Sequence, residues 1–170
     1  MNKNFATSEI VTIVSYLNEN LTDDKTKVLP TKFRWNLKKN LDKLVPIAQR
    51  FDAFREGLIK ELRENFFSEE KSEEYAETVK DDDGNAILDE DGNEQTTMMR
   101  RVKSEYMDDY KKTVADLNDK LSEILAETNS IEISTVDFDD FVNNLSDNSL
   151  ITFDDLSILC FMDETTNLSE

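Results

Sequence analysis

Residues 31–66 read TKFRWNLKKNLDKLVPIAQRFDAFREGLIKELRENF, and this stretch decides the fold. Its apolar side chains recur every third or fourth residue, the spacing that lines them along one face of an α-helix. The spacing continues for about nine helical turns, so we predict a long helix over 31–67. Pro46 lies inside it, where a missing N–H and a crowded preceding turn favour a kink or two abutting helices. The apolar positions are Phe33, Leu37, Leu41, Leu44, Ala48, Phe51, Phe54, Leu58, Leu62 and Phe66.

A second apolar stripe with similar spacing predicts another long helix over 98–128. Burying one stripe against the other pairs the two helices in antiparallel fashion. The small number of glycines and prolines also favours long uninterrupted elements. We therefore predict a mainly α fold built on a long antiparallel helical hairpin. The second stripe comprises Val102, Tyr106, Tyr110, Val114, Leu117, Leu121 and Ile124.

Between these helices, residues 68–97 are rich in Asp, Glu and Gly. Two Asp-Gly-Asn turns bracket a short apolar run, which predicts a small acidic β-tongue at the tip of the hairpin. The same residues suggest a calcium loop, whose first position must offer an oxygen ligand. Placing Gly84 at the loop's glycine position puts Val79 first, and placing Gly92 there puts Ile87 first. Both registers fail, so we predict no dedicated metal site.

Shorter elements flank the hairpin, and we expect one domain over 1–170. Thr7 is a candidate N-cap for a helix over 7–20, which is followed by a polar loop.

At the other end, we predict a strand and short helices over 130–163, packed on the open end of the hairpin. The strand runs from Ile131 to Val136, where apolar and polar residues alternate. Thr152 with Asp155 has the spacing of a capping box and opens the last helix. We expect residues 164–170 to be a frayed tail.

Composition excludes several kinds of active site. The chain has no histidine and a single cysteine, Cys160, so it has no Ser-His-Asp or Cys-His mechanism and no zinc site of the usual ligands. Cys160 lies in an apolar run, which predicts an inert core thiol with a raised pKa. We predict a protein that is not an enzyme and holds no cofactor. We find no secretory signal and no apolar stretch near the roughly 20 residues that span a bilayer, so we expect a cytoplasmic protein without membrane contact.

The net charge of −18 is unevenly distributed. Residues 68–96 and residues 130–170 are the acidic parts, and the second of these contains no Lys or Arg. Such surfaces keep a protein soluble, and they also suit docking onto a basic partner, including by mimicry of nucleic acid. The candidate partner-binding residues are Asp137, Asp139, Asp140, Asp147, Asp154 and Asp155, with Asp81, Asp82, Asp83, Asp89 and Asp91 in the middle segment.

The stretch that starts at Lys32, KFRWNLKK, places basic residues around the only tryptophan. We do not expect direct nucleic-acid binding there, because the field of the whole molecule is repulsive and Phe33 and Leu37 belong to the apolar stripe. We predict that Trp35 is a packing anchor.

The chain resembles a family of small uncharacterised proteins, a domain of unknown function, from tailed phages and prophages of Firmicutes. The matching residues are Leu29-Pro30-Thr31-Lys32, Asn36 to Asn40, Phe51 to Ile59, Asp83-Gly84-Asn85, and Ile131-Glu-Ile with Leu156 to Met162. The acidic insert is longer here and the C-terminal end more acidic. The resemblance implies a viral origin and offers no catalytic residue to carry over.

Three functions fit these observations. The first is a non-catalytic interaction module, phage-encoded, that binds and inhibits a basic host protein of nucleic-acid handling or defence. The second is an assembly accessory of the virion that uses the hairpin to form an oligomer. The third is an enzyme with Mg²⁺ bound by carboxylates, which the sequence favours least.

Overall fold

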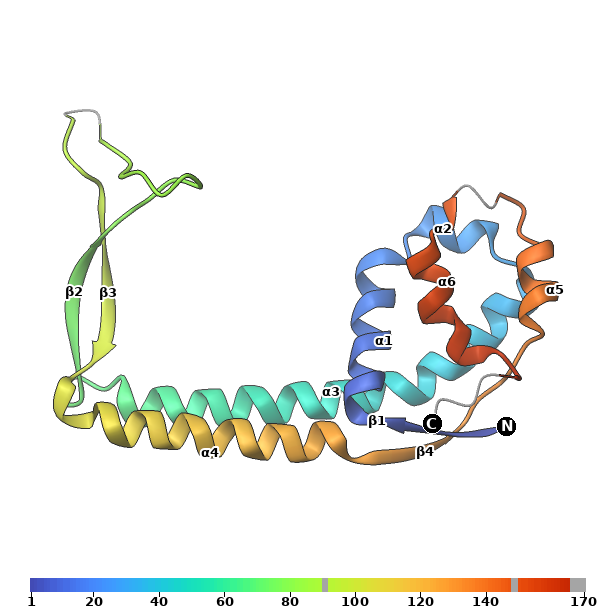
Figure 1. Ribbon diagram of the computed structural model, residues 1–170, viewed down its shortest axis with the longest axis horizontal. Coiled ribbons are helices and arrows are strands. Elements are labelled where there is room, and N and C mark those ends of the chain that lie inside the picture. Colours follow the sequence, from blue (N-terminus) through green and yellow to red (C-terminus); the bar gives the residue numbers. More distant parts are fainter. Residues whose placement is uncertain (90–91, 148–149, 166–170) are drawn as a thin grey trace. The chain divides into compact units, whose positions relative to one another are not determined.

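The computed structural model describes residues 1–89, 92–147 and 150–165. This part of the chain is mainly helical, with one long helix and two small antiparallel sheets, so the predicted mainly α class is confirmed (Figure 1). Contacts divide the chain into two compact units, where we expected a single domain. Unit 1 comprises Met1–Phe54 with Leu121–Glu170, and unit 2 comprises Arg55–Lys120.

The longest element is α3 (Thr31–Phe66), which follows the apolar stripe of the sequence. It continues without a break through Pro46, so the alternative of two abutting helices is wrong, and the kink stays a prediction. The other elements are β1 (Asn2–Ala6), α1 (Thr7–Asn20), α2 (Asp23–Val28), β2 (Ser72–Thr78), β3 (Thr96–Val102), η1 (Ser104–Tyr106), α4 (Met107–Ala126), β4 (Thr128–Glu132), α5 (Phe138–Asn143), α6 (Phe153–Leu159) and η3 (Cys160–Met162).

The N-terminal strand β1 of unit 1 is an element that we did not predict. It pairs with β4 in antiparallel register, with Lys3 opposite Ile131. In β1, the buried residues Lys3 and Phe5 alternate with exposed ones. Because one of the two inward positions is a lysine, the sequence does not show this alternation as an apolar pattern. The strand also corrects the start of the first helix: Ala6 is its N-cap, and Thr7 is its first residue.

The strand β4 begins before the predicted Ile131, and the chain beyond Glu132 is held by side chains of α3. Asn40, fully buried, donates from Nδ2 to the Ser134 carbonyl at 3.0 Å and accepts from the Ser134 N–H at 2.8 Å. Lys43 Nζ donates to the Glu132 carbonyl at 2.5 Å. Side chains of α3 thus supply hydrogen bonds to this extended segment beyond the last pair of the sheet.

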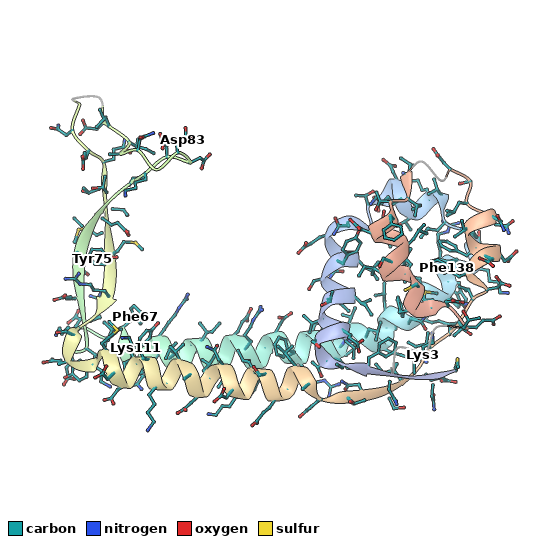
Figure 2. All side chains as sticks on the ribbon, in the orientation of Figure 1. Lys3, Phe67, Tyr75, Asp83, Lys111 and Phe138 are labelled. Carbon is teal, nitrogen blue, oxygen red and sulfur yellow. The ribbon has the colours of Figure 1, made fainter. Side chains whose placement is uncertain are left out.

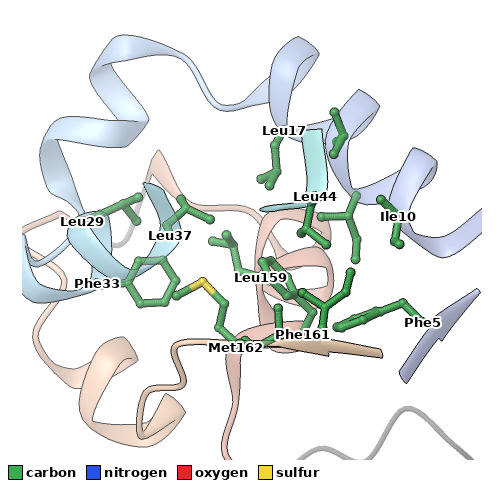
Figure 3. Close-up of a cluster of buried hydrophobic side chains, with 14 of the residues drawn as sticks. Phe5, Ile10, Leu17, Leu29, Phe33, Leu37, Leu44, Leu159, Phe161 and Met162 are labelled. Carbon is green, nitrogen blue, oxygen red and sulfur yellow. The ribbon is translucent and has the colours of Figure 1, made fainter. Parts of the chain in front are cut away.

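A single hydrophobic core fills unit 1 (Figure 3). It joins α1, the first half of α3, the strands and the C-terminal helices, and Phe33 stacks on Phe141 with ring centroids 3.9 Å apart. The short helices predicted within 130–163 are α5 and α6, and both contribute to this core. The largest fully buried side chains in the core are Phe5, Ile10, Leu29, Phe33, Leu44, Ile133, Leu159, Phe161 and Met162.

In unit 2, residues 96–102 form the strand β3, where we predicted the start of a helix. The four-residue step from Met98 to Val102 fits one face of a strand as well as a helix, and pairing with β2 decides between them. The register sets Glu73 opposite Arg101 and Tyr75 opposite Met99. The helix α4 then begins at Met107.

Two similar turns continue the ribbon of β2 and β3. Gly84 and Gly92 have φ values of +85° and +82°, a backbone conformation that glycine adopts without strain. Val79, Ile87 and Gln95 are joined in a closed ring of backbone hydrogen bonds of 2.8 Å each.

Candidate functional site

Three of the predicted carboxylates of unit 1, Asp137, Asp139 and Asp140, lie at the start of α5. Asp137 caps this helix, because its Oδ1 accepts a hydrogen bond of 2.9 Å from the Asp140 N–H. Phe141 is buried in the core and fixes the opposite face of the helix. The cap and the buried ring together leave Asp139 and Asp140 exposed. Among the described residues, no hydrogen bond or ion pair occupies the Asp139 carboxylate.

Backbone bonds bring the end of the chain beside this helix. The Val136 N–H donates to the Met162 carbonyl at 3.0 Å, and the Glu164 N–H donates to the Val136 carbonyl at 3.2 Å. Asp163 and Glu164 therefore lie next to Asp137. Our sequence prediction missed both carboxylates: it assigned Glu164 to the frayed tail over 164–170, and it did not select Asp163, the last residue before that tail. Phe161 and Met162 are both buried, and no local pattern of the sequence marks the two carboxylates that follow them.

These residues form a concave acidic surface, which we call the acidic groove: Asp137, Phe138, Asp139, Asp163, Glu164 and Thr165. Its volume is about 240 Å³. Phe138, labelled in Figure 2, contributes an aromatic side chain to the lining of this groove. A second groove of about 470 Å³ continues past Asp137 and Asp140 to Lys32 of α3.

The buried side chain of Lys3 supports the acidic groove from behind. Its Nζ donates to the Phe161 carbonyl at 3.1 Å and to the Asp163 carbonyl. Burial lowers the pKa of Lys3, while the nearby Asp163 carboxylate opposes this shift. The contact anchors the backbone that carries Asp163.

Asp155 was predicted as a partner-binding residue, and this is wrong. Only 1% of it is exposed, and its carboxylate lies 2.6 Å from Lys25 Nζ. Its Oδ2 also accepts from the Thr152 N–H at 2.8 Å, which completes the predicted capping box of α6. Burial alone would raise the pKa of Asp155, but the hydrogen bonds from Lys25 and Thr152 hold the pKa below its usual value. Asp155 therefore stabilises the fold, as the cap of α6 and the ion-pair partner of Lys25.

The remaining predicted residues of unit 1 are exposed. Asp154 precedes Asp155 in the first turn of α6, and Asp147 follows α5. Neither residue lines the acidic groove.

The predicted carboxylates of unit 2 form a separate set on the two turns. Asp81 Oδ1 accepts from the N–H groups of Asn85 at 2.8 Å and Asp83 at 3.0 Å, and these bonds, the one from Asn85 first, lower the pKa of Asp81. Asp89 Oδ1 likewise accepts from the Asn93 N–H at 2.9 Å. These two side chains hold their own turns, whereas Asp82 and Asp83 are exposed and make no such bond (Figure 2). Asp91 lies outside the described residues.

Trp35 corrects another prediction, because it is 57% exposed and is no packing anchor. Lys39 Nζ lies 5.4 Å from the centre of its ring. Phe33 and Leu37, on either side of it in the sequence, are buried as predicted.

Cys160 is half-buried and less enclosed than predicted. It lines an apolar groove of about 290 Å³ between α1 and α6, and burial raises the pKa of its thiol.

Comparison with protein-family models, with curated proteins and with solved structures finds no match. Within residues 1–89, 92–147 and 150–165, no three His, Cys, Asp or Glu side chains come together in a way that could hold a metal ion. In the same part of the chain, no helix combines the length and the apolar character needed to cross a membrane.

Proposed function

We propose that this chain is a non-catalytic interaction module that binds a basic protein partner through the acidic groove of unit 1. The observation that carries the proposal is the convergence of Asp137, Asp139, Asp163 and Glu164 on one concave surface. These residues belong to a segment without Lys or Arg, and Lys3 of β1 lies close to Asp163 among them.

The groove suits recognition of Lys or Arg side chains. Charged hydrogen bonds to carboxylates are short and strong, and Phe138, which lines the same groove, gives the stem of a long basic side chain an apolar surface to pack on. Because the carboxylates are exposed, their attraction acts mainly on the association rate and weakens as salt rises.

The finer architecture and origin belong to the same proposal. The rings of Phe66 and Tyr110, 5.4 Å apart, support an antiparallel hairpin of α3 and α4 with an acidic β-tongue at its tip. In line with the resemblance to a phage family, the proposal takes the protein to act in the cytoplasm of a bacterial host. The proposed partner is a basic host protein of nucleic-acid handling or defence. Binding in the acidic groove would inhibit this partner.

Capture from bacterial lysate, treated with nuclease and washed at low and moderate salt, tests this function. The full-length tagged chain is compared with the Asp139→Asn/Glu164→Gln variant, whose two carboxylates have no role in the fold. The Asp82→Asn/Asp83→Asn variant is the matched control, since it loses the same charge from unit 2. We expect a basic protein that the wild type and the control retain and that moderate salt releases.

The groove variant should bind this protein at least about tenfold more weakly than the control does. Equal capture by the groove variant, or the absence of any basic protein among those captured, contradicts the proposal.

A further inference from the structure

The ribbon of β2 and β3 in unit 2 is uncovered on both faces. In Figure 1 it stands apart from the helical segments of its unit, and Tyr75 lies along it in Figure 2. Met98 is 63% exposed and Met99, on the opposite face, 44%. An isolated two-stranded ribbon with apolar side chains in water is marginally stable. This ribbon therefore gains from a further strand.

The unpaired backbone groups of the ribbon can be identified from its register. The Lys103 N–H donates to the Lys71 carbonyl, and the Val79 N–H donates to the Gln95 carbonyl. In an antiparallel ladder, opposite residues alternate between hydrogen-bonded and non-hydrogen-bonded pairs. Counting from the two bonded pairs, Lys71 with Lys103 and Val79 with Gln95, the pairs that contain Glu73, Tyr75 and Glu77 are also hydrogen-bonded. The N–H and C=O groups of the intervening residues point outward to the two edges. On β2 these are Glu74 and Ala76, and on β3 they are Met98 and Arg100.

The two edges carry opposite charges. The strand β2 contains Glu73, Glu74 and Glu77 and no basic residue, whereas β3 contains Arg100 and Arg101 and no acidic residue. Within the ribbon, Arg101 is paired with Glu73 at 2.8 Å and Arg100 with Glu74 at 3.1 Å. The guanidinium group of each arginine can donate to a second carboxylate at the edge of the ribbon that has no strand beside it.

We infer that a second copy of this chain pairs its β2 edge with the β3 edge of the first, extending the ribbon into a larger antiparallel sheet. Each arginine then lies between two glutamates, and the outward backbone groups are satisfied. Pairing like with like, β2 with β2 or β3 with β3, brings together two strands whose charges have the same sign. The complementarity therefore selects the contact of unlike edges. Because this contact is head-to-tail, repeated pairing produces either a closed ring or an open filament of copies.

Sedimentation velocity of the full-length chain over a range of concentrations at low salt tests the inference. We expect species larger than the 19.7 kDa monomer that grow with concentration. The Ala76→Pro variant removes one outward N–H without removing a bond of the ribbon, and proline is tolerated at sheet edges. It should associate at least about tenfold more weakly. Ala76→Val, which keeps the N–H, is the matched control and should associate like the wild type.

A charge-swapped chain makes the test independent of how proline affects the ribbon. Replacing Glu73→Arg, Glu74→Arg, Arg100→Glu and Arg101→Glu keeps the pairs within the ribbon and reverses both edges. This variant should associate with itself and exclude labelled wild type from its assemblies. A wild type that stays monomeric, or a swapped chain that mixes freely with it, overturns the inference.

Discussion

Unit 1 and unit 2 bury their apolar side chains to different extents. Every member of the main hydrophobic core belongs to unit 1. In unit 2, among the residues that the structure describes, only Phe66, Ser72 and Val102 are buried. Burial of apolar side chains therefore stabilises unit 1 much more than unit 2, which relies on half-buried helix contacts and on an exposed ribbon.

The acidic side chains of the two units differ in the same way. Unit 1 uses Asp155 inside its fold and presents Asp139 and Glu164 at its surface. Unit 2 uses Asp81 and Asp89 only to hold exposed turns. Position in the fold, rather than the number of carboxylates, thus separates residues that stabilise the protein from residues that can bind a partner.

The largest effect is expected from breaking the internal carboxylate of unit 1. Asp155→Ala leaves Lys25 without its buried partner and removes the cap of α6, so the free energy of unfolding should fall by roughly 3–5 kcal/mol. Urea unfolding followed by circular dichroism measures it. The control is Asp154→Ala, the neighbouring exposed carboxylate, which should change stability by less than about 0.5 kcal/mol. Similar losses in both variants would place Asp155 at the surface after all.

The same carboxylate gives unit 1 a pH dependence. The folded pKa of Asp155 is below the ordinary value of 3.8. Its contribution is therefore complete above that value and is lost as pH falls from it through the lower folded pKa. We expect the urea midpoint of the wild type to fall more steeply below about pH 4 than that of Asp155→Asn. Parallel curves would show that other carboxylates cause the acid sensitivity.

Hydrogen exchange compares the units directly. At a concentration low enough to keep the chain monomeric, amides of β3 should exchange at least about a hundredfold faster than those of the α1 interior, relative to their intrinsic rates. The strand β1 is the control, because it also belongs to a two-stranded sheet but packs Phe5 into the core. Equal protection of β1 and β3 would remove the distinction between the units.

The sequence predicted those elements whose signals are local. The apolar stripe from Phe33 to Phe66 matches α3, and Thr152 with Asp155 begins α6 as a capping box does. Elements that depend on distant partners were missed. The strand β1 needs β4, and the switch of Met98 from helix to strand needs β2.

The candidate site was predicted with the same limitation. Asp137, Asp139 and Asp140 stand together because they are adjacent in the chain. Their neighbours Asp163 and Glu164 arrive through backbone bonds to Val136, which no local pattern reveals. Asp155 was misplaced because its partner, Lys25, is distant in the sequence.

The smallest effect is expected at Trp35, which tests whether the surface of unit 1 contributes to its stability. The ring is mostly exposed, and its contact with Lys39 is of a kind worth about 0.5–1 kcal/mol at exposed sites. Trp35→Ala should therefore lower the free energy of unfolding by no more than about 1 kcal/mol. Leu37→Ala, two residues further along α3 and buried in the core, should cost roughly 2–5 kcal/mol and serves as the comparison. Because Trp35 is the only tryptophan, iodide should quench nearly all of the native fluorescence that is excited selectively in tryptophan. A protected emission together with a loss near that of Leu37→Ala would show that Trp35 packs as the sequence first indicated, and that the exposed face of α3 belongs to the core.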